Sequence, residues 1–108
     1  MSVNLQEAAL YCRMELKSYG LKDHSIVWQE WLHTLGEAWA SDKEIHLSFV
    51  CLRNKELLME VVKHEIAHVL DHKERGTFLR NGRNDFHGAN WKKWCKVVGV
   101  RPRRFIPV

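Results

Sequence analysis

The sequence predicts a small α+β fold: an N-terminal helix, a short antiparallel sheet of two to three strands, a long helix and a further short C-terminal helix. Apolar residues recur at helical spacing in residues 3 to 19, β-branched and aromatic residues dominate from Ser25 to Ser48, and strong helix formers follow Asn54. The chain has 108 residues, which suits one hydrophobic core, so we expect a single domain over residues 1–108.

The first helix is expected over residues 3 to 19. Apolar side chains follow one another there in steps of three and four residues, which places them on one face of a helix. They are Leu5, Ala8, Ala9, Cys12, Leu16 and Tyr19. Gly20 comes directly after this run and is the kind of residue at which helices end. The segment is therefore an amphipathic helix with a glycine stop.

The segment from Ser25 to Ser48 is expected to form the sheet. It contains the β-type runs 26–28 and 38–40, and the polar turn 41–43 separates the second run from an alternating strand at Ile45 and Leu47. We expect all of these strands to be antiparallel. The hairpin that ends in 45–48 is further expected either to offer an exposed edge to an extended peptide or to be capped by solvent alone.

The sequence of the second half of the chain predicts two helices separated by a loop. Asn54 is a candidate N-cap and Gly76 a candidate stop, which together bound a helix of about six turns. Residues 77–87 are polar and show no period, so a loop is expected. A short helix is expected over roughly 88–98, followed by a basic tail over 98–108.

Cysteine usage and hydropathy indicate a cytoplasmic protein. Cys12, Cys51 and Cys95 are odd in number, widely spaced and free of any CxxC pair. We therefore interpret them as reduced thiols in the core, in a chain without a secretory leader. No stretch approaches the roughly 20 apolar residues that a membrane span requires, so no membrane partner is expected.

The residues with the clearest chemistry form the segment His64-Glu65-Ile66-Ala67-His68, an HExxH motif inside the predicted long helix. Four residues make slightly more than one helical turn, so both imidazoles project from the same side and can share one zinc ion. Glu65 is rotated by about 100° from His64. It is expected to act as the general base of a zinc-dependent peptidase without being a ligand.

A catalytic zinc requires three protein ligands and one open position, so a third ligand must come from elsewhere. The candidates are His72, His87, Glu74 and Asp71. His72 is eight residues from His64, a rise of roughly 12 Å, whereas nitrogens on one zinc lie within about 4 Å of each other. His87 follows the loop, which is long enough to fold back, and we predict that it is the third ligand.

The motif and the later segment His87-Gly88-Ala89-Asn90-Trp91-Lys92 together resemble the SprT-like metallopeptidase family, which includes the Spartan proteases that degrade proteins crosslinked to DNA. The segments 35–38 and 45–48 are similar to the hairpin that precedes the family's active-site helix. This resemblance covers about residues 1–98 and implies a zincin-like fold in which the HExxH helix is completed by a His from an HGxxW-type segment. Many members also carry a C-terminal zinc ribbon with paired CxxC motifs, which residues 1–108 lack.

These features predict a zinc metalloendopeptidase, a hydrolase acting on proteins or peptides. The formal net charge is +4, and basic residues gather in the last third of the chain, so DNA is a candidate partner, either directly or through DNA-associated substrates. The basic residues expected to contact nucleic acid are Lys92, Lys93, Lys96, Arg101, Arg103 and Arg104. A solvated basic face is the simpler interpretation of the same charges.

Two other functions fit the same residues. The first is a zinc-containing nucleic-acid-binding module in which Trp91, Trp94 and the basic tail make the contacts. The second is an inactive relative that binds metal and a partner but cuts nothing. The sequence also leaves open which group would stabilise an oxyanion, with His46 and Arg83 as candidates.

Overall fold

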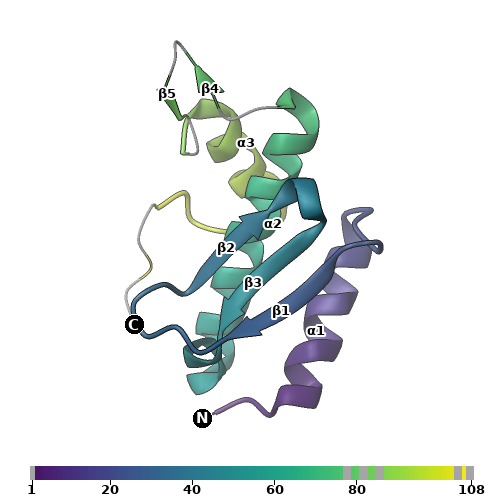
Figure 1. Cartoon of the computed structure of the whole chain (residues 1–108), viewed down its shortest axis with the longest axis vertical. Coiled ribbons are helices and arrows are strands. Elements are labelled where there is room, and N and C mark those ends of the chain that lie inside the picture. The colour runs from purple at the N-terminus through teal and green to yellow at the C-terminus, as the bar shows by residue number, and fades with distance from the viewer. Residues whose placement is uncertain (1, 77–78, 81–82, 85–86, 104–105, 107–108) are drawn as a thin grey trace.

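The computed structural model describes residues 2–76, 79–80, 83–84, 87–103 and 106. Its main elements are α1 (Leu5–Ser18), β1 (Ser25–Gln29), β2 (Gly36–Trp39), β3 (Glu44–Ser48), α2 (Lys55–Arg75) and α3 (Ala89–Val98). Single 3-10 turns over Ala40–Asp42 and Phe49–Arg53 flank β3. Figure 1 shows the sheet lying against α2, with α1 beside β1 and α3 beside α2. The α+β class and the order of its helices and sheet are those that the sequence predicts.

The helix α2 begins and ends at the residues that the sequence marks, whereas α1 begins only at Leu5, after an N-cap at Asn4. Asn54 caps α2, since its side chain accepts a hydrogen bond of 2.7 Å from the backbone nitrogen of Leu57. Gly76 ends the same helix with φ at +74°, a conformation that glycine adopts without a steric penalty. Within the described part of the chain, no helix is both long enough and apolar enough to cross a membrane.

The sheet differs from the prediction in the direction of one strand. The strand order is β1-β3-β2, with β3 antiparallel to β2 but parallel to β1. The reason is the path of residues 30–35, which cross the end of β3: Ser48 donates from its backbone nitrogen to the carbonyl of Leu35 at 2.9 Å and from its hydroxyl to the carbonyl of Trp31 at 2.5 Å. The chain thus reaches the far side of the sheet before β2 begins, and β3 returns between its two neighbours.

This topology shows which strand of the expected hairpin lies at an edge. β3 is the central strand, because it is paired on both sides, so the edge of the hairpin is β2 and not residues 45–48. The edges of this sheet are β1 and β2. An incoming strand could therefore pair only with one of these two.

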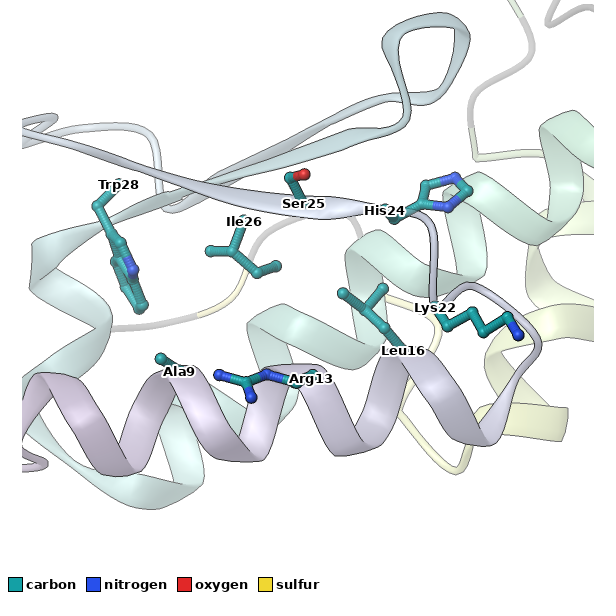
Figure 2. A pocket seen from close by; sticks show the side chains of 8 residues that line it. All are labelled: Ala9, Arg13, Leu16, Lys22, His24, Ser25, Ile26 and Trp28. Atoms are coloured by element: carbon teal, nitrogen blue, oxygen red, sulfur yellow. The ribbon is translucent and has the colours of Figure 1, made fainter.

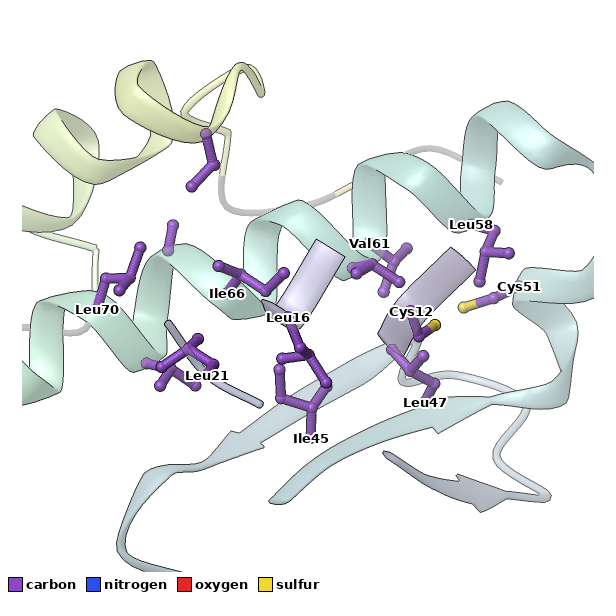
Figure 3. Packing of buried hydrophobic residues seen from close by; sticks show 14 of the residues in the cluster. Cys12, Leu16, Leu21, Ile45, Leu47, Cys51, Leu58, Val61, Ile66 and Leu70 are labelled. Carbon is purple, nitrogen blue, oxygen red and sulfur yellow. The ribbon is translucent and has the colours of Figure 1, made fainter. Parts of the chain in front are cut away.

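One face of the sheet forms the core with α1 and α2. Figure 3 shows Ile45 and Leu47 pointing from β3 toward α2, with Cys12 and Leu16 of α1 in the same cluster. All four side chains are buried. The cysteines are free and buried, which confirms their assignment to the core. The amphipathic pattern of residues 3 to 19 is therefore confirmed for Ala8, Cys12 and Leu16, whereas Leu5 is 46% exposed.

The opposite face of the sheet carries a buried histidine. His46 is only 3% exposed, and its ring stacks on Trp39 with 3.7 Å between the ring centroids. Its two ring nitrogens lie 2.9 Å from the side chains of Gln29 and Glu44. The side chains of β3 thus alternate between the two faces of the sheet as expected. The polar face is nevertheless covered at His46, where Trp39 stacks on the ring.

The sequence predicts a loop over residues 77–87, but part of this segment forms strands. Two short strands, β4 (Leu79–Arg80) and β5 (Arg83–Asn84), pair in antiparallel orientation. Strands of two residues are too short to show a period in sequence, which is why the prediction of an unbroken loop was wrong here. The other residues of 77–86 lie outside the described part of the chain.

Candidate metal centre

Three histidines from two parts of the chain lie together. His64 and His68 lie one turn apart on α2, and His87 lies in the turn before α3. One ring nitrogen from each lies within 4.8 Å of the other two. His64 and His68 are 6% and 8% exposed, so water competes little for these nitrogens. The structure therefore brings together the same three residues that the sequence singled out, and together they could hold a metal ion.

Trp91 forms one wall of this cluster. Its ring is fully buried and stacks on His68 with an interplanar angle of 17°, while it lies nearly perpendicular to His87 at 89°. A third ring contact joins it to His64. The suggestion that Trp91 stacks on nucleic-acid bases is therefore wrong, since a ring with no exposed surface cannot receive a base.

The electrostatics of the cluster favour neutral imidazoles. Burial lowers the pKa of His64 to about 4, and the nearby His87 adds to the effect. Burial also lowers the pKa of His68 to about 3, with further contributions from His64 and His87. Both rings are consequently neutral at pH 7, which is the form that binds a metal.

A metal ion fits the donor set that these residues present. His64 Nδ1 is buried and finds no hydrogen-bond partner among the described residues, an unusual state for a polar atom in a protein interior. Three imidazole nitrogens are a known set of ligands for a catalytic zinc ion. Nitrogens bound to one zinc lie about 3.4 Å apart, so the rings would need to close by roughly an ångström.

Glu65 lies on α2 against the start of β2. It is 5% exposed, and burial raises the pKa of its carboxyl group to about 8, with the charge of Glu37 adding to the rise. Gly36 makes this packing possible, because a Cβ atom there would lie 3.0 Å from Val61 and 3.1 Å from Glu65 Oε2. The sequence alone does not indicate this role of Gly36, because the contact depends on how the sheet packs against α2.

The raised pKa of Glu65 predicts a pH-dependent effect of Glu65→Gln on the stability of the metal-free protein. The unfolded carboxyl group loses its proton near its usual pKa of 4.5, whereas the folded one keeps it up to a pKa of about 8. The stability that this shift contributes is complete below the unfolded pKa and is lost as the pH rises through the folded pKa. Because glutamine does not ionise, we expect Tm of Glu65→Gln minus Tm of wild type to grow by several degrees between about pH 5 and pH 9.

Thermal melts of both proteins in EDTA across this range would measure the difference. Glu56→Gln is the matched control, since Glu56 is exposed in the first turn of the same helix. Parallel Tm curves for wild type and Glu65→Gln would contradict the assignment of a buried, protonated carboxyl group.

The other candidate ligands are not members of the cluster. The metal-capable group that the described residues form contains neither His72 nor the two acidic candidates. Asp71 is fully buried and bonds to Arg75 and Asn90. Glu74 is exposed and pairs with Lys93 at 2.7 Å. His72 therefore lies outside the cluster, as the axial rise of the helix predicts.

The basic residues proposed for nucleic acid differ in their surroundings. Lys92, Lys96 and Arg101 are exposed. Lys93 pairs with Glu74, and Arg103 makes two hydrogen bonds of 2.6 Å to Glu60. Arg104 lies outside the described residues. Part of the basic character of this region is thus neutralised within the chain.

His46 is separated from the cluster by the sheet. Ile45 and Leu47 point toward α2, so His46 between them points to the opposite face. Gly36, which packs on Glu65, is paired with Leu47 and so belongs to the helix-facing side. His46 is therefore poorly placed to stabilise an oxyanion beside Glu65.

A separate hollow of about 260 Å³ lies between α1 and β1. Figure 2 shows Ile26 and Trp28 pointing from β1 toward Ala9 and Arg13 of α1. None of the three clustered histidines lines it. The hollow is thus distinct from the candidate metal centre.

Comparisons with known proteins agree with the motif. A sequence profile described as the SprT-like family matches residues 6–107. A curated relative, Protein SprT of Klebsiella pneumoniae subsp. pneumoniae, is 37% identical over 84 residues, which cover 74% of this chain and 46% of that protein. Protein SprT of Enterobacter sp. (strain 638) is 32% identical over 114 residues, covering 96% of this chain and 66% of that protein.

The chain therefore spans about half to two thirds of the length of these relatives. No solved structure gives a significant match. The profile nonetheless extends over almost the whole chain, including the HExxH helix and the later segment that begins at His87. On this evidence the chain belongs to the SprT-like family.

Proposed function

We propose that this protein is a zinc-dependent metallopeptidase of the zincin type, a hydrolase that cleaves peptide bonds. His64, His68 and His87 are the proposed ligands, and Glu65 is the proposed general base. The observation that carries the proposal is the cluster of three imidazoles, of which the two on α2 are neutral, beside a buried carboxyl group on α2. Family membership supports the same conclusion, since SprT-like domains are commonly described as metallopeptidases.

The chemistry divides between the metal and the protein. When bound, zinc supplies a Lewis acid that polarises the scissile carbonyl and makes water more acidic. Glu65 accepts a proton from the attacking water at its carboxylate and returns it to the leaving amine. Its low exposure keeps bulk water away from this proton transfer. A nearby cation also favours the ionised carboxylate, opposing the rise in pKa that burial causes.

The edge strand β2 is the proposed docking site for the substrate backbone. β2 is paired with β3 on one side and lies at the edge of the sheet. Its first residue, Gly36, packs directly against Glu65. An extended peptide that added to this edge by main-chain hydrogen bonds would pass close to the general base. This arrangement favours an unfolded or locally extended protein segment as substrate.

Metal removal tests the proposed function. We expect the purified protein to contain zinc and to cleave an unfolded protein such as reduced, alkylated lactalbumin. EDTA should abolish cleavage, because Glu65 alone cannot polarise the carbonyl, and added zinc should restore it. Fragment analysis by mass spectrometry and metal analysis of the same samples provide the measurements. A zinc-loaded protein that leaves unfolded, DNA-bound and DNA-crosslinked proteins intact would favour the inactive, metal-binding alternative.

A further inference from the structure

Asp71 is a fully buried acid close to the candidate metal centre, to which it contributes no ligand atom. It follows His64 by seven residues and His68 by three. Because 3.6 residues complete a turn, Asp71 lies on nearly the same face of α2 as His64, roughly one turn beyond His68. This is the face of α2 against which His87 and Trp91 lie.

The carboxylate of Asp71 has partners on two helices. Arg75 donates from Nε to Oδ1 at 2.6 Å and from Nη2 to Oδ2 at 2.9 Å. This pair neutralises the buried charge, which would otherwise be costly, but both residues belong to α2. Asn90 donates from Nδ2 to Oδ1 at 2.6 Å, and this bond joins α2 to the first turn of α3.

The start of α3 needs such an external contact. Its N-cap is Gly88, which has no side chain to accept a hydrogen bond from the first turn. His87 lies immediately before Gly88, and Asn90 lies three residues after His87. Any fraying of this first turn would therefore move His87 away from the two histidines of α2.

We propose that Asp71 and Asn90 are positioning residues whose hydrogen bond fixes His87 beside His64 and His68 for metal binding. The inference rests on the proposed metal centre and adds a second group of residues to it. Arg75 holds Asp71 in one orientation, Asp71 holds Asn90, and Asn90 holds the turn that carries His87. The three ligands are thus held close together before the metal binds, so that only the closure of roughly an ångström remains.

A second contact between the same helices supplies a matched control. Lys93 Nζ donates to Glu74 at 2.7 Å, so it also joins α3 to α2. Both of these side chains are largely exposed, and Lys93 lies in the following turn of α3. If the Asp71–Asn90 bond only held the helices together, loss of either contact would have similar consequences. If it positions His87, only the Asn90 variant should change the metal site.

The test compares Asn90→Ala and Lys93→Ala with the wild type. Zinc affinity is measured by competition with a chromophoric chelator, the coordination of Co²⁺ by its visible absorption spectrum, and the stability of the metal-free protein by its Tm. We expect Asn90→Ala to weaken zinc binding by about tenfold to one hundredfold, the usual effect of losing a group that orients a ligand. Its Co²⁺ spectrum should also change, while Lys93→Ala should keep both the wild-type affinity and spectrum.

An exchange of the two side chains makes the test independent of simple destabilisation. Asn90→Asp alone places two carboxylates against each other and should weaken zinc binding at least as much as Asn90→Ala. The double variant Asp71→Asn/Asn90→Asp restores an amide–carboxylate bond with the roles reversed, and it should recover part of the affinity lost in Asn90→Asp.

Three results would each overturn the inference or its basis. Wild-type affinity and spectrum in Asn90→Ala would show that the bond does not position His87. Equal losses of zinc affinity in Asn90→Ala and Lys93→Ala would show that the bond contributes only to the general packing of α3 against α2. A wild-type protein that binds no zinc would instead contradict the proposed metal centre itself, and with it the role assigned to the bond.

Discussion

Glu65→Gln is expected to reduce peptide hydrolysis by at least about two orders of magnitude while zinc binding and the fold remain intact. The amide keeps the size of the side chain and therefore the packing against Gly36. It cannot accept a proton from water, so the reaction loses its general base. Rates of cleavage of an unfolded protein by zinc-loaded wild type and variant, with metal content determined in both, would measure the effect.

The control for this experiment is Glu56→Gln, an exposed change in the first turn of the same helix. It should cleave at the wild-type rate. If Glu65→Gln is equally active with zinc confirmed in both proteins, the catalytic role of Glu65 is wrong. Loss of activity together with loss of zinc would indicate that Glu65 supports the metal site instead of the proton transfer.

The three residues of the candidate metal centre could be predicted from the sequence, because their proximity depends on helix spacing and on the length of the chain between them. The spacing of His64 and His68 on a helix fixes their common face, and the axial rise of a helix excludes His72. His87 could be predicted as the third ligand because eighteen residues separate it from His68, and this length allows the chain to fold back over the helix. The helix boundaries at Asn54 and Gly76 likewise follow from local capping chemistry.

The features that sequence missed depend on contacts between distant residues. The parallel pairing of β1 with β3 arises from the path of residues 30–35 over the end of β3, which no local pattern encodes. The burial of Trp91 depends on where α3 packs. From the sequence alone, a Trp beside basic residues is equally compatible with an exposed ring that stacks on nucleic-acid bases. The contact of Gly36 with Glu65 appears only when the sheet is placed against α2.

A partial signal for the Asp71–Asn90 bond was nevertheless present. Asp71 has the helical spacing of the two motif histidines, and Asn90 follows His87 by three residues, so each lies about one turn from a proposed ligand. What sequence could not decide is whether Asp71 was itself a ligand. The structure answers this question, since Asp71 is not part of the metal-capable group of the described residues and its carboxylate bonds to Arg75 and Asn90 instead.

Replacement of each histidine in turn should separate ligands from bystanders. We expect His64→Ala, His68→Ala and His87→Ala each to weaken zinc binding by more than the roughly tenfold to one hundredfold that loss of an orienting partner costs. His72→Ala should retain the wild-type affinity, because His72 is not among the clustered histidines of the described chain. Chelator competition and metal analysis of the four variants provide the measurement, with the Tm of each metal-free protein as a check on folding.

The His87→Ala variant is the most informative of the four, because His87 is the only proposed ligand outside α2. With two histidines left one turn apart on a helix, zinc would keep two protein ligands instead of three and lose the geometry of a catalytic site. The added stability that zinc gives the folded protein should fall with the affinity, so the rise in Tm on adding zinc should shrink in the same variant. If His87→Ala binds zinc as tightly as wild type and keeps the full rise in Tm, the third ligand is another residue. The Asp71–Asn90 bond would then have no ligand to position.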